Sequence, residues 1–329
     1  MNSQISETQK KALQSILQWL QNQFFQKLRY LLGPLYNGTQ MHSDLPINLY
    51  TLKRNIHRLE KGLIHKNRKP IFAQDFILET IFAYHFCTSQ CLMEPVMRGW
   101  VEAVLESYFK DVDKSAPMIM EAWAYFEGLN PRNDLPSSQP YSISKRPELN
   151  VSYQDFLDLS IRRRSVRHFL AKTVEPDIIK RAITVAAQAP SACNRQAFRF
   201  LFFNQPEVAT RIAGITGGVS GYELPAILVI VSDYSAYADV RDIKSPIIDA
   251  SLAVMSFCFA LETLNLSSVC INWPCEVTFD EKLRTIIAIE NHESVVMLMG
   301  VGYPAADAVI PFSAKKTVDD LFSCNERIK

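Results

Sequence analysis

Hydrophobic side chains return at helical spacing in the first part of the chain. Between Lys10 and Leu32 the apolar positions recur every three or four residues, and mostly glutamine and lysine occupy the opposite face. This pattern predicts an amphipathic helix that packs on the rest of the protein or on a partner subunit. The alternative is a helix lying on a membrane surface, which is disfavoured because the polar face holds more Gln than Lys or Arg.

Further helices are expected as far as the middle of the chain. The Gly33-Pro34 pair stops the first helix, and a second helical segment begins near Asn48 and ends at Gly62. Apolar periodicity then predicts three more helices, over residues 73–90, 94–109 and 116–126. Residues 1–127 are therefore predicted to form an all-helical N-terminal lobe.

The pattern changes after a linker. Pro, Ser, Asn and Asp accumulate over residues 128–150, where apolar periodicity disappears. Beyond the linker, helices are predicted over residues 152–163 and from Glu175 to just before Pro190. Four apolar runs predict buried strands: FRFLFF (198–203), AILVIV (226–231), SVCINW (268–273) and SVVMLMGV (294–301). Residues 151–329 are thus predicted to form an α+β domain, a sheet flanked by helices.

One apolar stretch approaches membrane-spanning length. Residues 247–266 are interrupted by Asp249, Glu262 and other polar residues, so we interpret them as a buried helix of a globular domain and expect no membrane span. The composition agrees with this interpretation. Hydrophobic residues make up 48% of the 329 residues and charged residues 21%, which suits a large buried core.

Charge and cysteine usage narrow the possible partners. Lys and Arg number 35 against 34 acidic residues, so the net charge of +1 offers no field that would attract nucleic acid or an anionic membrane. The seven cysteines are an odd number spread thinly along the chain, and the first residues lack the pattern of a secretory signal. We expect a cytoplasmic protein whose thiols stay reduced.

The helical lobe contains one charged group with possible chemistry. His57 and Lys61 stand on one helical face with Glu60 adjacent, a combination that suits proton transfer. A solvated charged face is the favoured alternative for these three residues.

A histidine and two cysteines in the same lobe invite a metal hypothesis. Cys87 and Cys91 are one helical turn apart, and His85 lies beside them. A zinc site needs a second pair of ligands, and the sequence offers none nearby. We therefore favour buried thiols and predict no metal.

An arginine-rich segment follows the first helix of the C-terminal half. It reads Arg162-Arg163-Arg164-Ser165-Val166-Arg167. Guanidinium groups and a hydroxyl can surround a phosphate, because their donors match its oxygens. A solvated basic helix end is the alternative.

A second segment lies between a helix and a strand. It reads Ala189-Pro190-Ser191-Ala192-Cys193-Asn194-Arg195-Gln196. Small residues allow the backbone to approach a flat ring, and Ser, Asn and Gln side chains can hydrogen-bond to its polar edge. Alone, this segment could be an ordinary turn.

Taken together, the R-R-S-V-R and A-P-S-x-x-N-x-Q segments resemble those of the nitroreductase superfamily of flavoproteins, in the same order and with a helix between them. The resemblance runs from about Val151 to the C-terminus and includes Gly302-Tyr303-Pro304 and the closing segment 314–320. It implies a nitroreductase-like, FMN-dependent oxidoreductase that forms a homodimer and binds flavin between its subunits.

The resemblance also assigns residues to the flavin. The phosphate and ribityl end would be held by Arg163, Arg164, Ser165 and Arg167, assisted by Lys315 or Lys316. The residues that approach the flavin, commonly from the partner subunit, would be Pro190, Ser191, Ala192 and Asn194, with Gln196 nearby.

Two stretches depart from the family's pattern. Where family members often have Gly-Leu-Gly before a strand and a glycine near flavin N5, this chain has Asn265-Leu266-Ser267-Ser268 and then Ile271-Asn272-Trp273-Pro274. Asn272 and Trp273 are the positional matches at the reactive edge. Trp273 could stack on a substrate or fill the core.

The implied reaction is a two-electron transfer between NAD(P)H and a small organic acceptor. The chain has no G-x-G-x-x-G fingerprint, so the nicotinamide would enter the flavin cleft itself. Alternatives are a dehydrogenase or dehalogenase of a biosynthetic pathway, and a non-catalytic flavin-binding partner subunit.

The helical lobe lies outside the common family core. Residues 57–63, H-R-L-E-K-G-L, are similar to a stretch of N-terminally extended nitroreductase-like proteins of bacteria. The lobe is therefore a candidate lid over the flavin, which would bring His57, Glu60 or Lys61 to the substrate.

Overall fold

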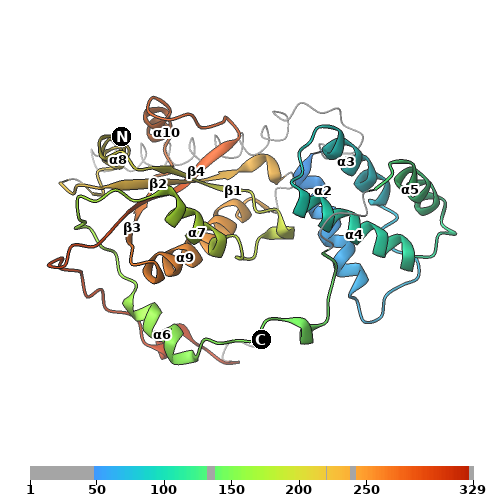
Figure 1. Cartoon of the computed structure of the whole chain (residues 1–329), viewed down its shortest axis with the longest axis horizontal. Helices are drawn as coiled ribbons and strands as arrows, with labels where there is room; N and C mark the ends of the chain where they lie inside the picture. The colour runs from blue at the N-terminus through green and yellow to red at the C-terminus, as the bar shows by residue number, and fades with distance from the viewer. Residues whose placement is uncertain (1–47, 132–137, 220, 238–241, 326–329) are drawn as a thin grey trace, which may run out of the picture.

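The computed structural model describes residues 48–131, 138–219, 221–237 and 242–325 (Figure 1). A helical lobe and a sheet domain lie side by side, with the N-terminal end of the lobe's first helix next to the sheet domain (Figure 1). The amphipathic helix expected over residues 10–32 lies outside the described residues.

Within the described residues, the helical lobe contains four helices, each at a predicted segment. They are α2 (Leu49–Leu63), α3 (Ile77–Ser89), α4 (Pro95–Asp111) and α5 (Pro117–Gly128). Asn48 starts α2, because its side-chain oxygen accepts a 2.9 Å hydrogen bond from the Thr51 backbone N–H. Proline in the first turn of α4 and α5 costs no helical hydrogen bond there. The four helices share one apolar core of their own.

Gly62 does not end α2, so that prediction was wrong. The helix continues to Leu63, and Ile64 caps it through backbone hydrogen bonds to Glu60 and Gly62. A Cβ atom at Gly62 would lie 2.3 Å from the Phe72 ring, so glycine is needed for this close contact rather than for a turn.

The sheet domain contains four antiparallel strands in the order β1-β2-β4-β3. They are β1 (Phe198–Phe203), β2 (Ala226–Asp233), β3 (Ser267–Asn272) and β4 (Glu293–Gly302), each close to its predicted run. Alternate residues of β2 point to opposite faces: Leu228 and Ile230 enter one apolar core, and Val229 and Val231 enter the other. The fold is the predicted α+β arrangement.

Helices cover both faces of the sheet. Figure 1 shows α7 (Pro176–Ala186) and α9 (Ser245–Thr263) on one face, and α8 (Pro206–Gly214) and α10 (Val277–Arg284) on the other. The helix α6 (Tyr153–Arg162) contacts α9 and begins with a capping box between Ser152 and Asp155. The short helix α11 (Val318–Leu321) lies in the C-terminal segment.

One prediction about burial needs correction. The run 198–203 was expected to be a buried strand, but β1 is an edge strand with no fully buried residue, because nothing pairs with its outer edge within the described chain. The helix α9 buries one face and leaves apolar side chains exposed on the other. By length and composition α9 could cross a membrane, as core helices of globular proteins also could, and 56% of its most apolar window is buried.

Candidate functional site

The arginine-rich segment runs alongside the free edge of the sheet. Ser165 forms a parallel bridge with Ser268 of β3, and the Val166 N–H donates a 3.0 Å hydrogen bond to the Ser268 carbonyl. A few residues later Phe169 pairs with Pro304, directly after β4. Glycine at position 302 permits this approach, since a Cβ there would lie 2.8 Å from the Phe169 ring. The segment is thus held by the sheet and not by a flexible loop.

Arg163 carries a polar atom without a partner. Its Nε is buried and has no hydrogen-bond acceptor among the described residues, whereas most buried donors in proteins are paired. Next to it, Arg162 forms a 3.2 Å ion pair with Glu262 of α9. Burial raises the pKa of Glu262, and the charges of Arg162 and Arg163 oppose that shift. Arg162 is therefore paired with a buried carboxylate, while the Nε of Arg163 has no hydrogen-bond acceptor among the described residues.

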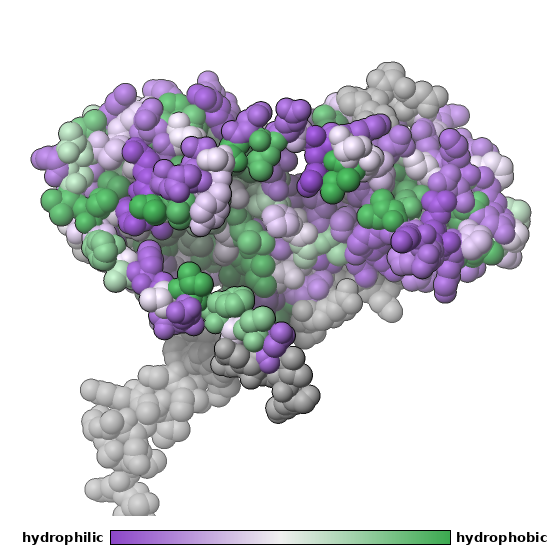
Figure 2. All heavy atoms as spheres, turned by 90° about the horizontal axis from the view of Figure 1, so that it is seen from below, coloured by the Kyte–Doolittle hydropathy of each residue, from purple (hydrophilic) through white to green (hydrophobic). Residues whose placement is uncertain are grey.

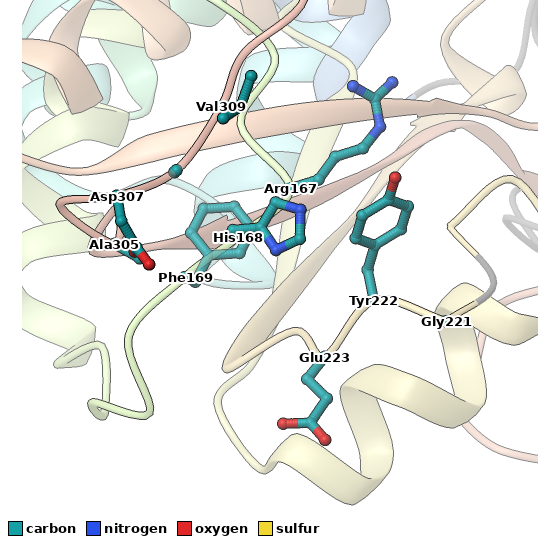
Figure 3. A pocket seen from close by; sticks show the side chains of 10 residues that line it. Arg167, His168, Phe169, Gly221, Tyr222, Glu223, Ala305, Asp307 and Val309 are labelled. Carbon is teal, nitrogen blue, oxygen red and sulfur yellow. The ribbon is translucent and has the colours of Figure 1, made fainter.

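Arg167 lines a cavity of about 550 Å³ (Figure 3). The cavity also involves His168, Tyr222, Glu223, Asp307 and Val309. The His168 and Tyr222 rings meet edge to face, with their centroids 5.3 Å apart, and the Tyr222 hydroxyl and the Arg167 guanidinium point the same way in Figure 3. This gives the cavity both a cationic and a phenolic donor.

The loop between α7 and β1 has an unusual backbone. Cys193, Asn194 and Gln196 all have positive φ, at 53°, 53° and 51°, although none of them is glycine. Such strain costs free energy, is tolerated where the surrounding structure enforces it, and clusters at ligand-binding segments. The Gln196 side chain helps to enforce it by donating a 2.8 Å hydrogen bond to the Ala187 carbonyl. Gln196 is thus occupied within the loop.

A buried aspartate of α9 anchors the same loop. One carboxylate oxygen of Asp249 accepts hydrogen bonds from the Ala192 backbone N–H at 2.9 Å and from the Tyr237 hydroxyl at 2.8 Å. Burial raises the pKa of Asp249, and these hydrogen bonds partly offset it. Asp249 is one of two acids in the apolar helix α9, and the sequence alone indicates only that such a helix does not span a membrane.

The helical lobe touches this loop through the first two turns of α2. Lys53 Nζ donates a 2.8 Å hydrogen bond to the Arg195 carbonyl, and the Tyr50 side chain packs in an apolar cluster with Ala192. Burial lowers the pKa of Lys53 to about 8. Sequence reasoning missed Tyr50 and Lys53, because nothing in their spacing distinguishes them from other helix-surface residues.

The three charged residues expected on α2 lie one to two turns further along the helix. Glu60 accepts a 2.9 Å hydrogen bond from the Trp100 indole and lies 3.6 Å from His57 Nδ1, so both are engaged within the lobe. Lys61 is exposed. A role for any of them in proton transfer stays a prediction.

Cys87 and Cys91 form no metal site with other described residues. Cys87 is buried, which raises its pKa to about 12, but Cys91 lies beyond the end of the helix and is exposed. The expectation of a buried thiol was therefore right for Cys87 and wrong for Cys91. No group of His, Cys, Asp or Glu in the described ranges is arranged to hold a metal ion.

The remaining predicted site residues are spread over the sheet domain. Asn272 ends β3 and is exposed, whereas Trp273 is buried in the core beneath α10 and donates a 2.9 Å hydrogen bond to Asp280. Trp273 thus occupies the core position that was one of its two expected places. Lys315 and Lys316 are exposed ahead of α11.

The two candidate segments lie at diagonally opposite corners of the sheet. The arginine segment adjoins the start of β3, and the loop 190–196 leads into the start of β1, at the other edge and the other end of the strands. The two corners are three strand spacings apart across the sheet and six residues apart along the strands, which gives a separation of about 25 Å. One chain therefore cannot close both segments around one ligand.

Comparison with known proteins shows that both segments lie within a stretch that matches a family profile. A profile described as the nitroreductase family matches residues 161–218 and 220–303, which include both segments. Iodotyrosine deiodinase 1 of Mus musculus is 23% identical over 262 residues, covering 69% of this chain and 87% of the relative. A putative NADH dehydrogenase/NAD(P)H nitroreductase of Methanothermobacter thermautotrophicus is 24% identical over 174 residues, covering 51% and 87%.

Solved structures match about half of the chain. An FMN-dependent nitroreductase of Clostridium difficile has 20% identity and a TM-score of 0.41, covering 50% of this chain and 93% of its own. A putative nitroreductase in complex with FMN from Desulfovibrio desulfuricans has 20% identity and a TM-score of 0.43, covering 50% and 94%.

Proposed function

Since the C-terminal half of this chain belongs to the nitroreductase family, we propose that the protein is an FMN-dependent oxidoreductase that accepts electrons from NAD(P)H. It passes them to a small organic acceptor. A homodimer forms the flavin site, and a reducing cytoplasm suits its seven free cysteines.

The unfilled Nε of Arg163 is the observation that carries the proposal. A buried guanidinium donor without an acceptor lies next to Ser165, in a segment that the sheet holds in place. A terminal phosphate supplies such an acceptor and matches the planar donors of arginine. Arg163, Arg164, Ser165 and Arg167 therefore fit the phosphate end of FMN.

The diagonal placement of the two segments supports a dimer. In an antiparallel pair of subunits, the arginine segment of one chain can face the loop 190–196 of the other, so that two equivalent sites form. The exposed apolar side chains of α9 offer the surface for this contact. They follow one helical stripe, at Ile248, Leu252 and Met255, and Figure 2 shows apolar side chains gathered on this side of the molecule.

The chain's own residues would bind and orient rather than react. FMN, when bound, supplies the two-electron chemistry, and the protein sets its position and surroundings. The strained loop 190–196 presents small side chains to the ring, and Asp249 keeps that loop in place. Arg167 and Tyr222 offer donors at the cavity beside the phosphate segment.

The test begins with purified full-length protein. We expect stoichiometric FMN, loss of its visible absorbance on adding NADH or NADPH, and recovery on adding a nitroaromatic or quinone. Arg164→Ala together with Arg167→Ala should lower FMN content at least tenfold, because two phosphate-facing cations are lost. The control Lys180→Ala, at an exposed residue of α7 paired with Asp177, should retain FMN. Full flavin retention in the double variant would contradict the phosphate site.

A second candidate is reductive dehalogenation. The mouse deiodinase match covers 69% of this chain, which is more than the family profile spans. In that reaction a carbon–iodine bond is replaced by carbon–hydrogen, with two electrons from the reduced flavin, one proton from solvent, and iodide leaving. Iodide release from 3-iodotyrosine by the dithionite-reduced protein would favour this candidate. Turnover of nitroaromatics without iodide release would exclude it.

A further inference from the structure

Three side chains of α2 form one stripe that faces the loop 190–196. Tyr50, Lys53 and Arg54 are spaced three and four residues apart, which places them on the same side of a helix. Tyr50 and Lys53 contact the loop directly, as described above. Arg54, the residue after Lys53, lies on the same side of the helix as these two residues. The helical lobe thus brings two cations to the segment proposed to line the flavin.

Arg54 is a cation in an unfavourable position. It is half-buried, and burial together with the positive charges of Arg58 and Arg195 lowers its pKa. The Glu79 carboxylate acts in the opposite direction, but Arg54 forms no ion pair or hydrogen bond with the described residues. Arg58, one turn along, is paired with Asp75 at 3.2 Å. A partly desolvated arginine without an anionic partner is costly unless a ligand supplies the anion.

Arg195 adds a buried donor to the same place. Only 4% of this residue is exposed, and its guanidinium lies 5.0 Å from the centre of the Tyr237 ring. Its Nη1 lies 3.2 Å from the Asp242 carboxylate, but its Nε has no hydrogen-bond acceptor among the described residues. Arg195 is therefore only partly satisfied, in a region where Lys53 and Arg54 also carry positive charge.

We propose that Arg54, with Lys53 and Arg195, forms an anion-binding site contributed jointly by the helical lobe and the loop 190–196, and that it selects acceptors bearing a carboxylate. This inference rests on the proposed flavin function, because that function makes the loop a wall of the substrate site. It assigns the lobe a role in specificity. The group that binds is a small planar anion, which a guanidinium holds through two parallel hydrogen bonds.

The site differs from the proton-transfer role expected for His57, Glu60 and Lys61. Those residues lie one to two turns further from the loop, about 5–10 Å along the helix axis. Arg54 acts on substrate affinity and leaves the redox step to the flavin. Its substitution should therefore change the preference among acceptors while leaving flavin content and reduction by nicotinamide unchanged.

The experiment compares two probes, benzoate and benzamide, on the FMN-loaded full-length protein. They share a benzene ring and differ only in that benzoate carries a carboxylate and benzamide a neutral amide. Isothermal titration calorimetry measures both affinities for the wild type, Arg54→Gln, and the control Lys66→Gln. Lys66→Gln removes an exposed cation of the same lobe that lies beyond α2. We expect the wild type and control to prefer benzoate at least tenfold. Arg54→Gln should reduce that preference about tenfold without changing benzamide affinity.

The outcomes separate this inference from the function on which it rests. A protein without FMN, or one that nicotinamide cannot reduce, contradicts both. Normal FMN content and reduction with equal affinities for benzoate and benzamide contradict the anion site alone. An Arg54→Gln variant that keeps the wild-type preference, or that loses affinity for both probes equally, also contradicts it. Steady-state kcat/KM for 4-nitrobenzoate against 4-nitrobenzamide should show the same change in ratio.

Discussion

The helical lobe and the sheet domain complete their cores in different ways. The lobe buries Leu52, Ile56 and Leu59 of α2 fully among its own helices. The sheet domain also has filled cores on both faces of its sheet, yet it leaves a continuous apolar stripe on α9, where Ile248 is 50% exposed. The C-terminal segment of the sheet domain also exposes apolar side chains, since Phe312 is 85% exposed.

This difference separates two kinds of unit. Contiguous exposed apolar surface is uncommon on monomers and marks an interaction site, whereas scattered exposed residues are normal. Among the described residues of the lobe, exposed apolar side chains lie on several different elements, such as Val96 of α4 and Met120 of α5. We infer that the sheet domain needs a second copy of the chain, and that the lobe is tied to it through α2 and the loop 190–196.

The largest expected effect is on the sheet domain's exposed stripe. Leu252→Glu places a carboxylate in the proposed interface, where an unpaired charge is costly to desolvate. The variant should be monomeric at micromolar concentration and should lose most of its FMN, because the proposed flavin site uses residues of both chains. Light scattering and flavin absorbance measure these two effects.

A matched change in the other region gives the control. Met120→Glu likewise puts a carboxylate at an exposed apolar residue, but on the helical lobe. It should leave both the mass of the dimer and the FMN content unchanged. A Leu252→Glu protein that remains dimeric and yellow would show that the stripe on α9 is not the interface.

A smaller effect is expected at the anchor of the loop 190–196. Asp249→Ala removes the acceptor for the Ala192 N–H and the Tyr237 hydroxyl, and each unsatisfied buried donor costs about 1–3 kcal/mol. FMN should bind at least tenfold more weakly, as measured by flavin fluorescence. Asp249→Asn keeps a carbonyl oxygen as acceptor and should lie closer to the wild type. Equal losses in both variants would mean that the charge matters and the hydrogen bonds do not.

The smallest effect concerns the contact between the two regions and depends on pH. Burial lowers the pKa of Lys53 from 10.5 to about 8, so between these values the unfolded chain holds more protons than the folded one. The free energy of unfolding of the wild type should therefore rise relative to Lys53→Met as pH increases from about 8 to 10.5. Denaturant unfolding at several pH values measures this difference. If the difference in free energy of unfolding between the two proteins does not change with pH, Lys53 is solvated and the contact between α2 and the loop is contradicted.

Much of the fold followed from local sequence. Apolar periodicity predicted α3, α4 and α5, and the strand runs lie within two residues of β1 to β4. These elements were predictable because side-chain spacing reports directly which face of a helix or strand is buried. Gly62 shows the limit of this reasoning. Its role depends on the Phe72 ring, which only the packed lobe brings near it.

The candidate site likewise contains residues that the sequence alone could identify and residues that it could not. The arginine segment and the loop 190–196 could be found from the sequence, because each is a contiguous run of residues with suitable donors. The loop contacts of Asp249 and Lys53 could not, since their partners in the loop are far away in the chain. Contacts between distant segments leave no periodic signal.

The sequence by itself determined the helical lobe, the four strands, and the two segments that carry the family's pattern, because short-range spacing and contiguous chemistry are properties of the chain. Only the tertiary structure decided that these two segments occupy opposite corners of the sheet, and that Arg163 keeps a buried donor unfilled. It also decided which turn of α2 meets the loop 190–196. Strand order and helix docking set these positions, and both result from packing across the whole domain.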